Sequence, residues 1–113
     1  MNAIVRFDCN GRIIDFDKTA EKLFGFSRFE VVGRGLCETI LPVRGADGRD
    51  MAKSVEDLCQ SPEDHKSIVL EAVKKNGDRL LMHWACCPFI DHNTGKRAVC
   101  AVGTDLSARD RAS

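Results

Sequence analysis

The stretch IVLEAVKKNGDRLLMHWACCPF, residues 68–89, decides how the second half of the chain folds. Its first six residues alternate between the two sides of an extended chain, which is the period of a β-strand. One side carries Ile68, Leu70 and Ala72. Asn76-Gly77 then signals a hairpin turn, because glycine accepts a positive φ at little cost. The rest of the stretch, from Arg79 to Phe89, returns as a long second strand.

The same pattern extends in both directions along the chain. Downstream, turn-forming residues 91–95 lead to a third strand at 96–104. Upstream, residues 4–7 and 12–16 are apolar runs separated by Asp8-Cys9-Asn10-Gly11, which has the chemistry of a turn. We therefore expect a β-hairpin at the N-terminus and a three-stranded meander at the C-terminus.

Two short helices are expected directly after the first hairpin. Asp17 can accept hydrogen bonds from the first turn of a helix, and Gly25 stands where a glycine commonly ends one. Ser27 and Glu30 form a capping box, in which each side chain accepts a backbone N–H of the other residue. Gly33 ends this second helix.

A longer helix is expected further on. A short segment at 36–41 stops at Pro42, because the residue before a proline avoids helical geometry. After a polar loop, residues 51–59 place apolar side chains at helical spacing, with Asp50 as the cap, and Ser61-Pro62 breaks the helix. The order ββ, short helices, βββ predicts an α+β fold.

Four local motifs resemble those of PAS domains, and they occur in the same order over nearly the whole chain. They are NGRII at 10–14, AEKLFGFSRFEVVG at 20–33, KNGD at 75–78 and GTDLS at 103–107. The resemblance implies a five-stranded antiparallel sheet with short helices on one face. It also implies a single PAS-like sensor domain over residues 1–113, as in bacterial-type signalling proteins.

In PAS proteins the last strand leads into a linker helix, and Asp105 occupies that position here. Its carboxylate can accept backbone N–H bonds from the residues that follow, so residues 105–113 are expected to start the C-terminal helix. The resemblance implies an effector domain beyond it in a full-length protein: a histidine kinase of a two-component system, a cyclic-dinucleotide enzyme or a transcription regulator. A signal would reach that domain through Asp105 as a population shift.

The long strand 79–89 has two faces with different expected roles. By the register of the family after its K-D-G turn, one face points to the interior. We expect the ligand pocket, if the interior is not simply packed, to be formed by Phe24, Leu41, Val55, Leu58, Met82 and Trp84. Apolar residues at such spacings serve equally well as core, so a pocket and a filled interior both remain open.

The opposite face of that strand is expected to form an interface. It is predicted to carry Leu81, His83, Ala85, Cys87 and, from the last strand, Val99. An apolar patch of this kind is costly to leave in water. We therefore expect a homodimer through this face, with a covering helix from flanking sequence as the alternative.

No cofactor is assigned from the sequence. Light-sensing flavin relatives carry a G-x-N-C-R-F-L motif, but here Cys37 is displaced by one position and the Asn and Arg-Phe-Leu are missing. Haem relatives use a histidine near the long helix, yet His65 follows acidic, polar residues. His83 is predicted on the outer face and His92 in a turn. Flavin and haem are therefore not expected, and any ligand is unknown.

Charge and cysteine content narrow the class of protein. Lys and Arg number 17, and so do Asp and Glu, which argues against nucleic acid as the partner. No 18-residue apolar run or signal peptide is present, so no membrane span is expected. The six cysteines include no C-x-x-C pair, so no structural zinc site is expected. We expect the thiols to be free and mostly buried, in a protein of the cytoplasm.

No catalytic motif accompanies these features. The chain lacks a phosphate-binding loop, H-E-x-x-H and G-x-S-x-G, so we expect no enzyme. The predicted function is a sensory, dimerising domain that responds to a small ligand or partner. The alternatives are a ligand-free interaction module and a thiol redox sensor that uses Cys37, Cys59 or Cys100.

Overall fold

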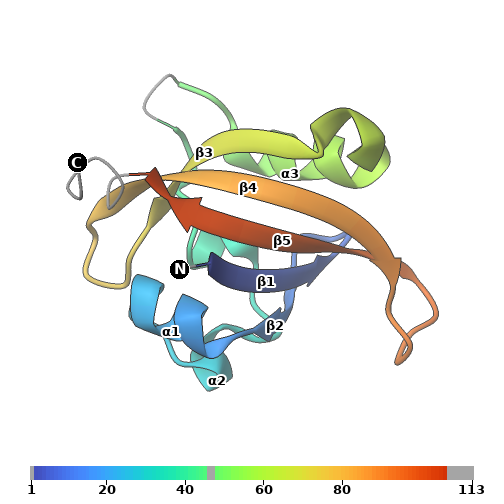
Figure 1. Ribbon diagram of the computed structural model, residues 1–113, viewed down its shortest axis with the longest axis horizontal. Coiled ribbons are helices and arrows are strands. Elements are labelled where there is room, and N and C mark those ends of the chain that lie inside the picture. The colour runs from blue at the N-terminus through green and yellow to red at the C-terminus, as the bar shows by residue number, and fades with distance from the viewer. Residues whose placement is uncertain (1, 46–47, 107–113) are drawn as a thin grey trace.

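Five strands form one antiparallel sheet in the computed structural model (Figure 1), which describes residues 2–45 and 48–106 without the side chains of Pro62 and His65. The spatial order is β2-β1-β5-β4-β3, so the N-terminal hairpin joins the C-terminal meander through β1 and β5. The predicted α+β fold with a five-stranded sheet is confirmed. The strands are β1 (Asn2–Asp8), β2 (Ile13–Phe16), β3 (Ser67–Val73), β4 (Arg79–Ile90) and β5 (Arg97–Asp105).

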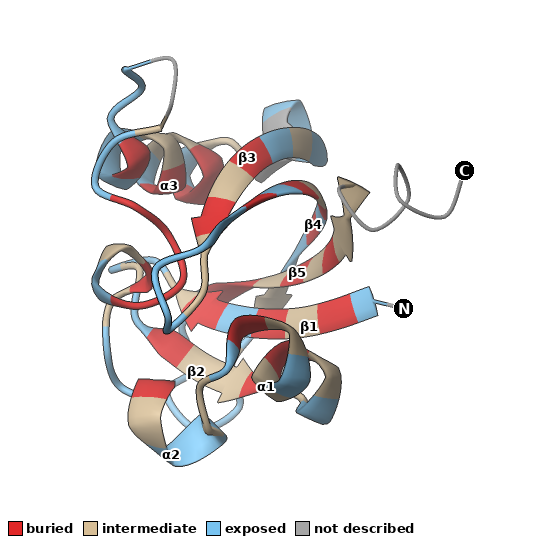
Figure 2. Cartoon of the chain, turned by 90° about the vertical axis from the view of Figure 1, so that its left-hand side faces the viewer, coloured by how far each residue is buried: buried red, intermediate tan, exposed pale blue. Residues whose placement is uncertain are grey.

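The helices connect the two groups of strands and lie in two places on the sheet (Figure 1, Figure 2). α1 and α2 lie beside β1 and β2, whereas α3 lies beside β3 at the opposite edge. Two 3-10 turns, η1 and η2, complete the connection. The bounds are α1 (Lys18–Phe24), α2 (Arg28–Val31), η1 (Leu36–Glu38), α3 (Met51–Gln60) and η2 (Pro62–His65).

Local sequence signals set the ends of these helices as predicted. The carboxylate of Asp17 accepts the Ala20 N–H at 2.8 Å, and Gly25 ends α1 with a φ of 81°. Both hydrogen bonds of the capping box between Ser27 and Glu30 are present. Side-chain caps satisfy backbone donors that have no partner inside the helix, so short helices can begin at defined residues.

The turn between β3 and β4 fastens the sheet to α1 and α2. The backbone N–H of Lys75 donates to the carbonyl of Phe24 at 2.8 Å. The ammonium of Lys75 lies 2.9 Å from Glu30 Oε1, and this hydrogen bond lowers the pKa of the Glu30 carboxyl. Gly77 adopts the positive φ of 94° that the turn requires. The turn is therefore an anchor as well as a connection.

On the inner face of the sheet a glycine makes room for an aromatic ring. Gly103 in β5 is directly opposite Trp84 in β4, with Ala3 of β1 on its other side. A Cβ at position 103 would lie only 2.6 Å from Trp84 Cζ3. The absence of a side chain at Gly103 therefore allows the indole to lie flat across β5.

The placement of Val99 on the outer face was wrong. Val99 pairs with Phe7 and Pro88 on the inner face and is only 2% exposed. Its neighbour Ala98 is also buried, so β5 has apolar, buried residues on both faces at this point. Alternation alone does not give the phase of such a strand, and a shift of one residue exchanges the faces.

No disulfide joins the cysteines in this structure, and most of the cysteines are not buried. Cys86 and Cys87 point to opposite faces of β4, as consecutive strand residues must. Burial falls into three classes: Cys59 and Cys86 are buried, Cys37 and Cys100 are half-buried, and Cys9 and Cys87 are exposed. The expectation of mostly buried thiols is therefore wrong for this chain.

Candidate ligand pocket

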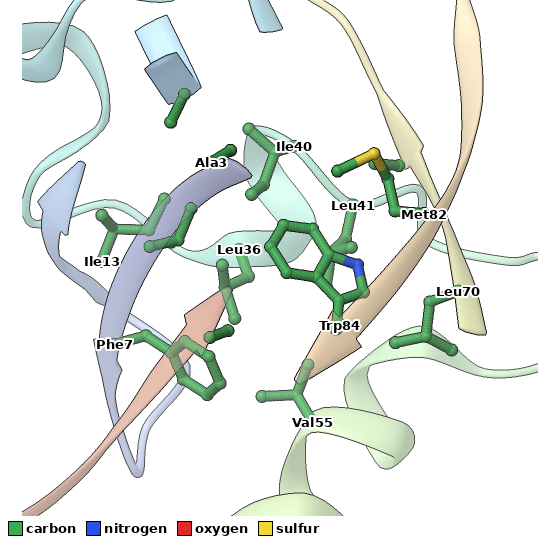
Figure 3. Close-up of a cluster of buried hydrophobic side chains, with 14 of the residues drawn as sticks. Ala3, Phe7, Ile13, Leu36, Ile40, Leu41, Val55, Leu70, Met82 and Trp84 are labelled. Atoms are coloured by element: carbon green, nitrogen blue, oxygen red, sulfur yellow. The ribbon is translucent and has the colours of Figure 1, made fainter. Parts of the chain in front are cut away.

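A small apolar cavity of about 30 Å³ lies between α3 and the inner face of the sheet. That volume is about what one or two water molecules occupy. Figure 3 shows Trp84 at the centre of the surrounding apolar side chains, which come from the sheet, from α3 and from the segment around η1. The cavity is lined by Val5, Phe7, Leu36, Ile40, Leu41, Ser54, Val55, Leu58, Ile68, Leu70, Trp84, Cys86 and Ala101.

Four of the six residues expected around a pocket line this cavity: Leu41, Val55, Leu58 and Trp84. The other two belong to the adjoining core. Phe24 is fully buried and stacks on Trp84, with the ring centroids 6.3 Å apart and the planes inclined by 14°. Met82 is also fully buried, and its methyl group approaches Gly103 beside the indole. The predicted set therefore surrounds Trp84, with the open space on the α3 side.

The indole of Trp84 contains a buried hydrogen-bond donor without a partner. Trp84 is 5% exposed, and its Nε1 has no acceptor among the described residues. The one other polar side chain among the described lining residues is Ser54, whose hydroxyl donates to the carbonyl of Asp50 at 3.3 Å. Buried donors are nearly always satisfied, and an unpaired one costs about 1–3 kcal/mol.

The cavity wall carries no charged side chain among its described residues. Cys86 is its only thiol there, and burial raises the pKa of that thiol to about 11. A thiol in this state is a weak nucleophile near neutral pH. The site can therefore hold an apolar group, with the unpaired Nε1–H of Trp84 as the nearby donor.

The residues considered for cofactors lie away from this cavity. Cys37 is half-buried in η1, where burial and the nearby Asp50 raise the pKa of its thiol. His83 lies on the outer face, with its Nε2 2.6 Å from Ser67 Oγ. His92 is exposed in the turn after β4, and the side chain of His65 lies outside the described part of the chain. Among the described residues, no three potential metal ligands cluster.

The outer face is apolar at one edge. Leu81 and Val69 are each 46% exposed, and Ala85 and Cys87 are also exposed on this face of β4. Val69 pairs with His83 across β3 and β4, which extends the patch over two strands. Four of the five residues expected here therefore lie on the outer face, and Val69 joins them in place of Val99.

Asp105 is the last residue of β5 and pairs with Met82. One residue separates it from Gly103, which contacts the indole of Trp84, so the end of the strand is close to the pocket along the chain. The expected linker helix over 105–113 lies almost wholly in residues 107–113, outside the described residues.

The chain belongs to the PAS fold family, whose model matches residues 2–106. PAS domains are sensory modules of signalling proteins. None of the curated proteins matches the chain significantly. No helix in the described part of the chain is long and apolar enough to cross a membrane.

Solved PAS structures resemble this one closely in fold and distantly in sequence. The PAS domain of an HTR-like protein from Haloarcula marismortui has a TM-score of 0.74 at 17% identity, over 92% of this chain and 80% of that one. The PAS domain of the quorum-sensing receptor RpfR from Cronobacter turicensis, in complex with BDSF, has a TM-score of 0.63 at 18% identity, over 93% of each chain.

A third similar structure places this fold in a larger protein. The blue-light activated histidine kinase EL346 from Erythrobacter litoralis has a TM-score of 0.62 at 18% identity. The match covers 93% of this chain but only 33% of the kinase. PAS domains therefore occur as parts of multidomain signalling proteins.

Sequence reasoning missed much of the cavity wall. Val5 and Phe7 of β1 and Ala101 of β5 line the cavity because strands distant in the sequence lie side by side, and Ile40 joins them from the segment after η1. Gly103 was noted only as part of the closing motif. A glycine inside an apolar strand was the available signal that another group approaches closely there.

Proposed function

We propose that this PAS domain senses a small amphipathic molecule that binds between α3 and the sheet. The ligand would have an aliphatic part and one oxygen that accepts a hydrogen bond, as a medium-chain ketone does. The unpaired Nε1–H of Trp84 carries this proposal, because it is a buried donor beside an apolar cavity. An oxygen placed there would recover the cost of the unpaired group.

Binding would require α3 to move. A cavity of about 30 Å³ is much smaller than a medium-chain molecule, whereas small-molecule sites commonly measure several hundred Å³. α3 contributes Ser54, Val55 and Leu58 to the wall, so an outward shift of this helix would enlarge the site. The ligand would then select the open arrangement, which is a population shift.

Two observations support a ligand-sensing function. The same fold forms the PAS domain of RpfR, a receptor whose structure is in complex with BDSF. The wall residues here are apolar apart from Ser54 and the indole donor, which matches an aliphatic molecule with one polar atom.

The test is calorimetric titration of the protein with 2-octanone. We expect saturable binding that weakens roughly 3- to 10-fold in Trp84→Phe, because that variant keeps an aromatic ring but loses the donor. Phe29→Leu is the matched control, since Phe29 is 96% exposed, and it should bind like the wild type. Equal affinity in Trp84→Phe, or no binding to the wild-type protein, would reject the proposal.

The proposed route of the signal is along β5. Ala101 lines the cavity, Gly103 touches the indole and Asp105 ends the strand, so one strand connects the ligand with the exit toward an effector domain. We propose a kinase, a cyclic-dinucleotide enzyme or a transcription regulator as that effector. Fusing the chain to a histidine kinase core and measuring autophosphorylation with and without 2-octanone would test the route.

The outer face favours homodimerisation. Leu81 and Val69 together present exposed apolar surface on adjacent strands, and self-association would remove it from water. Light scattering should give a dimer mass for the wild type and a monomer mass for Leu81→Glu. A monomeric wild type at high concentration would contradict this part, and a dimer that binds no ketone would favour a ligand-free interaction module.

We also propose that the chain has no catalytic activity of its own, acts in the cytoplasm and binds no nucleic acid. The high pKa of the Cys86 thiol and the lack of charged groups on the described cavity wall support the first point. Free thiols fit a reducing compartment. Equal numbers of acidic and basic residues support the third point, which a shift assay with mixed DNA and RNA fragments would test.

A further inference from the structure

Two cysteines fifty positions apart come together where the end of α3 meets the β1–β2 turn. Cys9 is exposed in the turn between β1 and β2, and Cys59 is buried in the last turn of α3. The thiol of Cys59 donates a long hydrogen bond of 3.9 Å to the carbonyl of Asp8, the residue before Cys9. Burial and the adjacent Cys9 thiol raise the pKa of Cys59 to about 12. The two side chains are therefore neighbours.

The helix that carries Cys59 is also the wall of the pocket. α3 packs on the β1–β2 turn at a second point, where a Cβ on Gly11 would lie 3.6 Å from Val55 Cγ1. Val55 and Leu58 line the cavity from the same helix. A covalent bond at Cys59 would therefore fix the helix that has to move for the cavity to open.

We propose that Cys9 and Cys59 form a reversible disulfide that fastens α3 to the β1–β2 turn and closes the pocket. We call the closing of the pocket by this disulfide the gating. The gating rests on the proposed ligand function, whereas the formation of the disulfide does not. The geometry favours this pair because the Cys9 thiol is reachable from solvent and the Cys59 thiol contacts the backbone of the preceding residue, Asp8.

We propose hydrogen peroxide as the oxidant, since it accepts the two electrons that the two thiols lose when the disulfide forms. The exposed Cys9 thiolate attacks one peroxide oxygen, the O–O bond breaks, and a sulfenic acid and one water result. The sulfur of Cys59 then attacks the Cys9 sulfur, the S–O bond breaks, and a second water leaves. Two thiols are oxidised, one peroxide is reduced, and the two thiol protons end in the water formed. Because its pKa is raised, Cys59 stays a thiol while the exposed Cys9 meets the oxidant. The resolving step then proceeds through the small thiolate fraction of Cys59, so its rate should increase with pH.

The test begins with the fully reduced chain, treated with one equivalent of hydrogen peroxide and mapped by mass spectrometry after digestion. We expect a Cys9–Cys59 disulfide, loss of two titratable thiols, and recovery of both with dithiothreitol. Hydrogen exchange of α3 amides should slow at least 10-fold in the oxidised chain. Cys9→Ser should lose both effects, whereas the matched control Cys87→Ser, also at an exposed thiol, should keep them.

A disulfide mapped to another pair, retention of all thiols, or unchanged exchange in an oxidised α3 would each overturn the proposal. None of these measurements involves a ligand, so their outcome is separate from the 2-octanone titration. For the gating part, oxidation should weaken 2-octanone binding at least 10-fold in the wild type and leave Cys9→Ser unchanged. Equal affinity of oxidised and reduced wild type would overturn the gating.

Discussion

The two ends of the helical layer are closed in different ways. At the α1–α2 end, backbone hydrogen bonds connect distant segments: Ile13 donates to the Arg34 carbonyl at 2.9 Å, and Gly33 donates to that of Ile13 at 2.8 Å. At the α3 end, Val55 and Leu58 face a cavity, and the contact of Cys59 with Asp8 is a long one. The first end is held by backbone hydrogen bonds between distant segments, and we propose that the second is the wall that moves when a ligand binds.

The largest expected effect is on the free energy of unfolding. It is tested with two matched valines, one at the α1–α2 end and one at the α3 end. Val31→Ala in α2 removes a fully buried side chain and should lower the free energy of unfolding by about 2–3 kcal/mol. Val55→Ala in α3 changes a side chain that already borders open space, so we expect about 1 kcal/mol. Urea unfolding measures both; equal losses would contradict a difference in packing.

The next largest effect on stability concerns the indole ring of Trp84, which lies between the two ends. Gly103→Ala places a methyl group within contact of Trp84 and should lower the free energy of unfolding by about 2 kcal/mol through overpacking. Combining it with Trp84→Leu should remove most of the added cost, since the smaller side chain relieves the clash. Additive losses in this double-mutant cycle would mean that Gly103 and Trp84 are not coupled.

A smaller effect is expected at the caps. Ser27→Ala removes the hydroxyl that accepts the Glu30 N–H and should cost about 1 kcal/mol, with faster hydrogen exchange confined to α2. Asp50→Ala removes the cap that accepts the Lys53 N–H, so it should speed exchange in α3 and, by loosening this wall, increase 2-octanone affinity. Unchanged affinity in Asp50→Ala would weaken the view of α3 as the movable wall.

The smallest effect is the pH dependence of the Glu30–Lys75 pair. The hydrogen bond from Lys75 holds the Glu30 pKa below its ordinary 4.5, so the pair contributes stability above that pH. This contribution disappears as the pH falls through the lowered pKa. Because both groups are solvent-exposed, the effect is small. The stability difference between wild type and Lys75→Met should be present at pH 7 and absent at pH 2–3; a pH-independent difference would indicate lost packing instead.

The parts of this molecule that depend on neighbouring residues were predictable from the sequence. Asp17, Gly25 and the Ser27–Glu30 box act within one or two helical turns, and each has its predicted role. The hairpin around Gly77 is equally local. Here the sequence pattern and the structure agree because the relevant hydrogen bonds close within a few residues.

The parts that depend on distant segments were harder to predict. Val99 was assigned to the wrong face because its strand is buried on both sides, and only its pairing with Phe7 sets the phase. The neighbouring thiols of Cys9 and Cys59 have no local signal, since α3 reaches the first turn only in the folded chain. The pocket was predictable only in part. Trp84 was identified from its place in the strand, but the lack of an acceptor for its Nε1 depends on which distant residues pack against the indole.

Ligand binding beside Trp84 is tested most directly by the indole resonance of that residue in a ¹H–¹⁵N spectrum. Trp84 is the only tryptophan, so the chain gives a single indole signal. On titration with 2-octanone, we expect a downfield shift of this proton as it gains an acceptor, with shifts of α3 amides at the same concentrations. An indole signal that stays in place up to the solubility limit of the ketone would mean that Trp84 donates no hydrogen bond to a ligand.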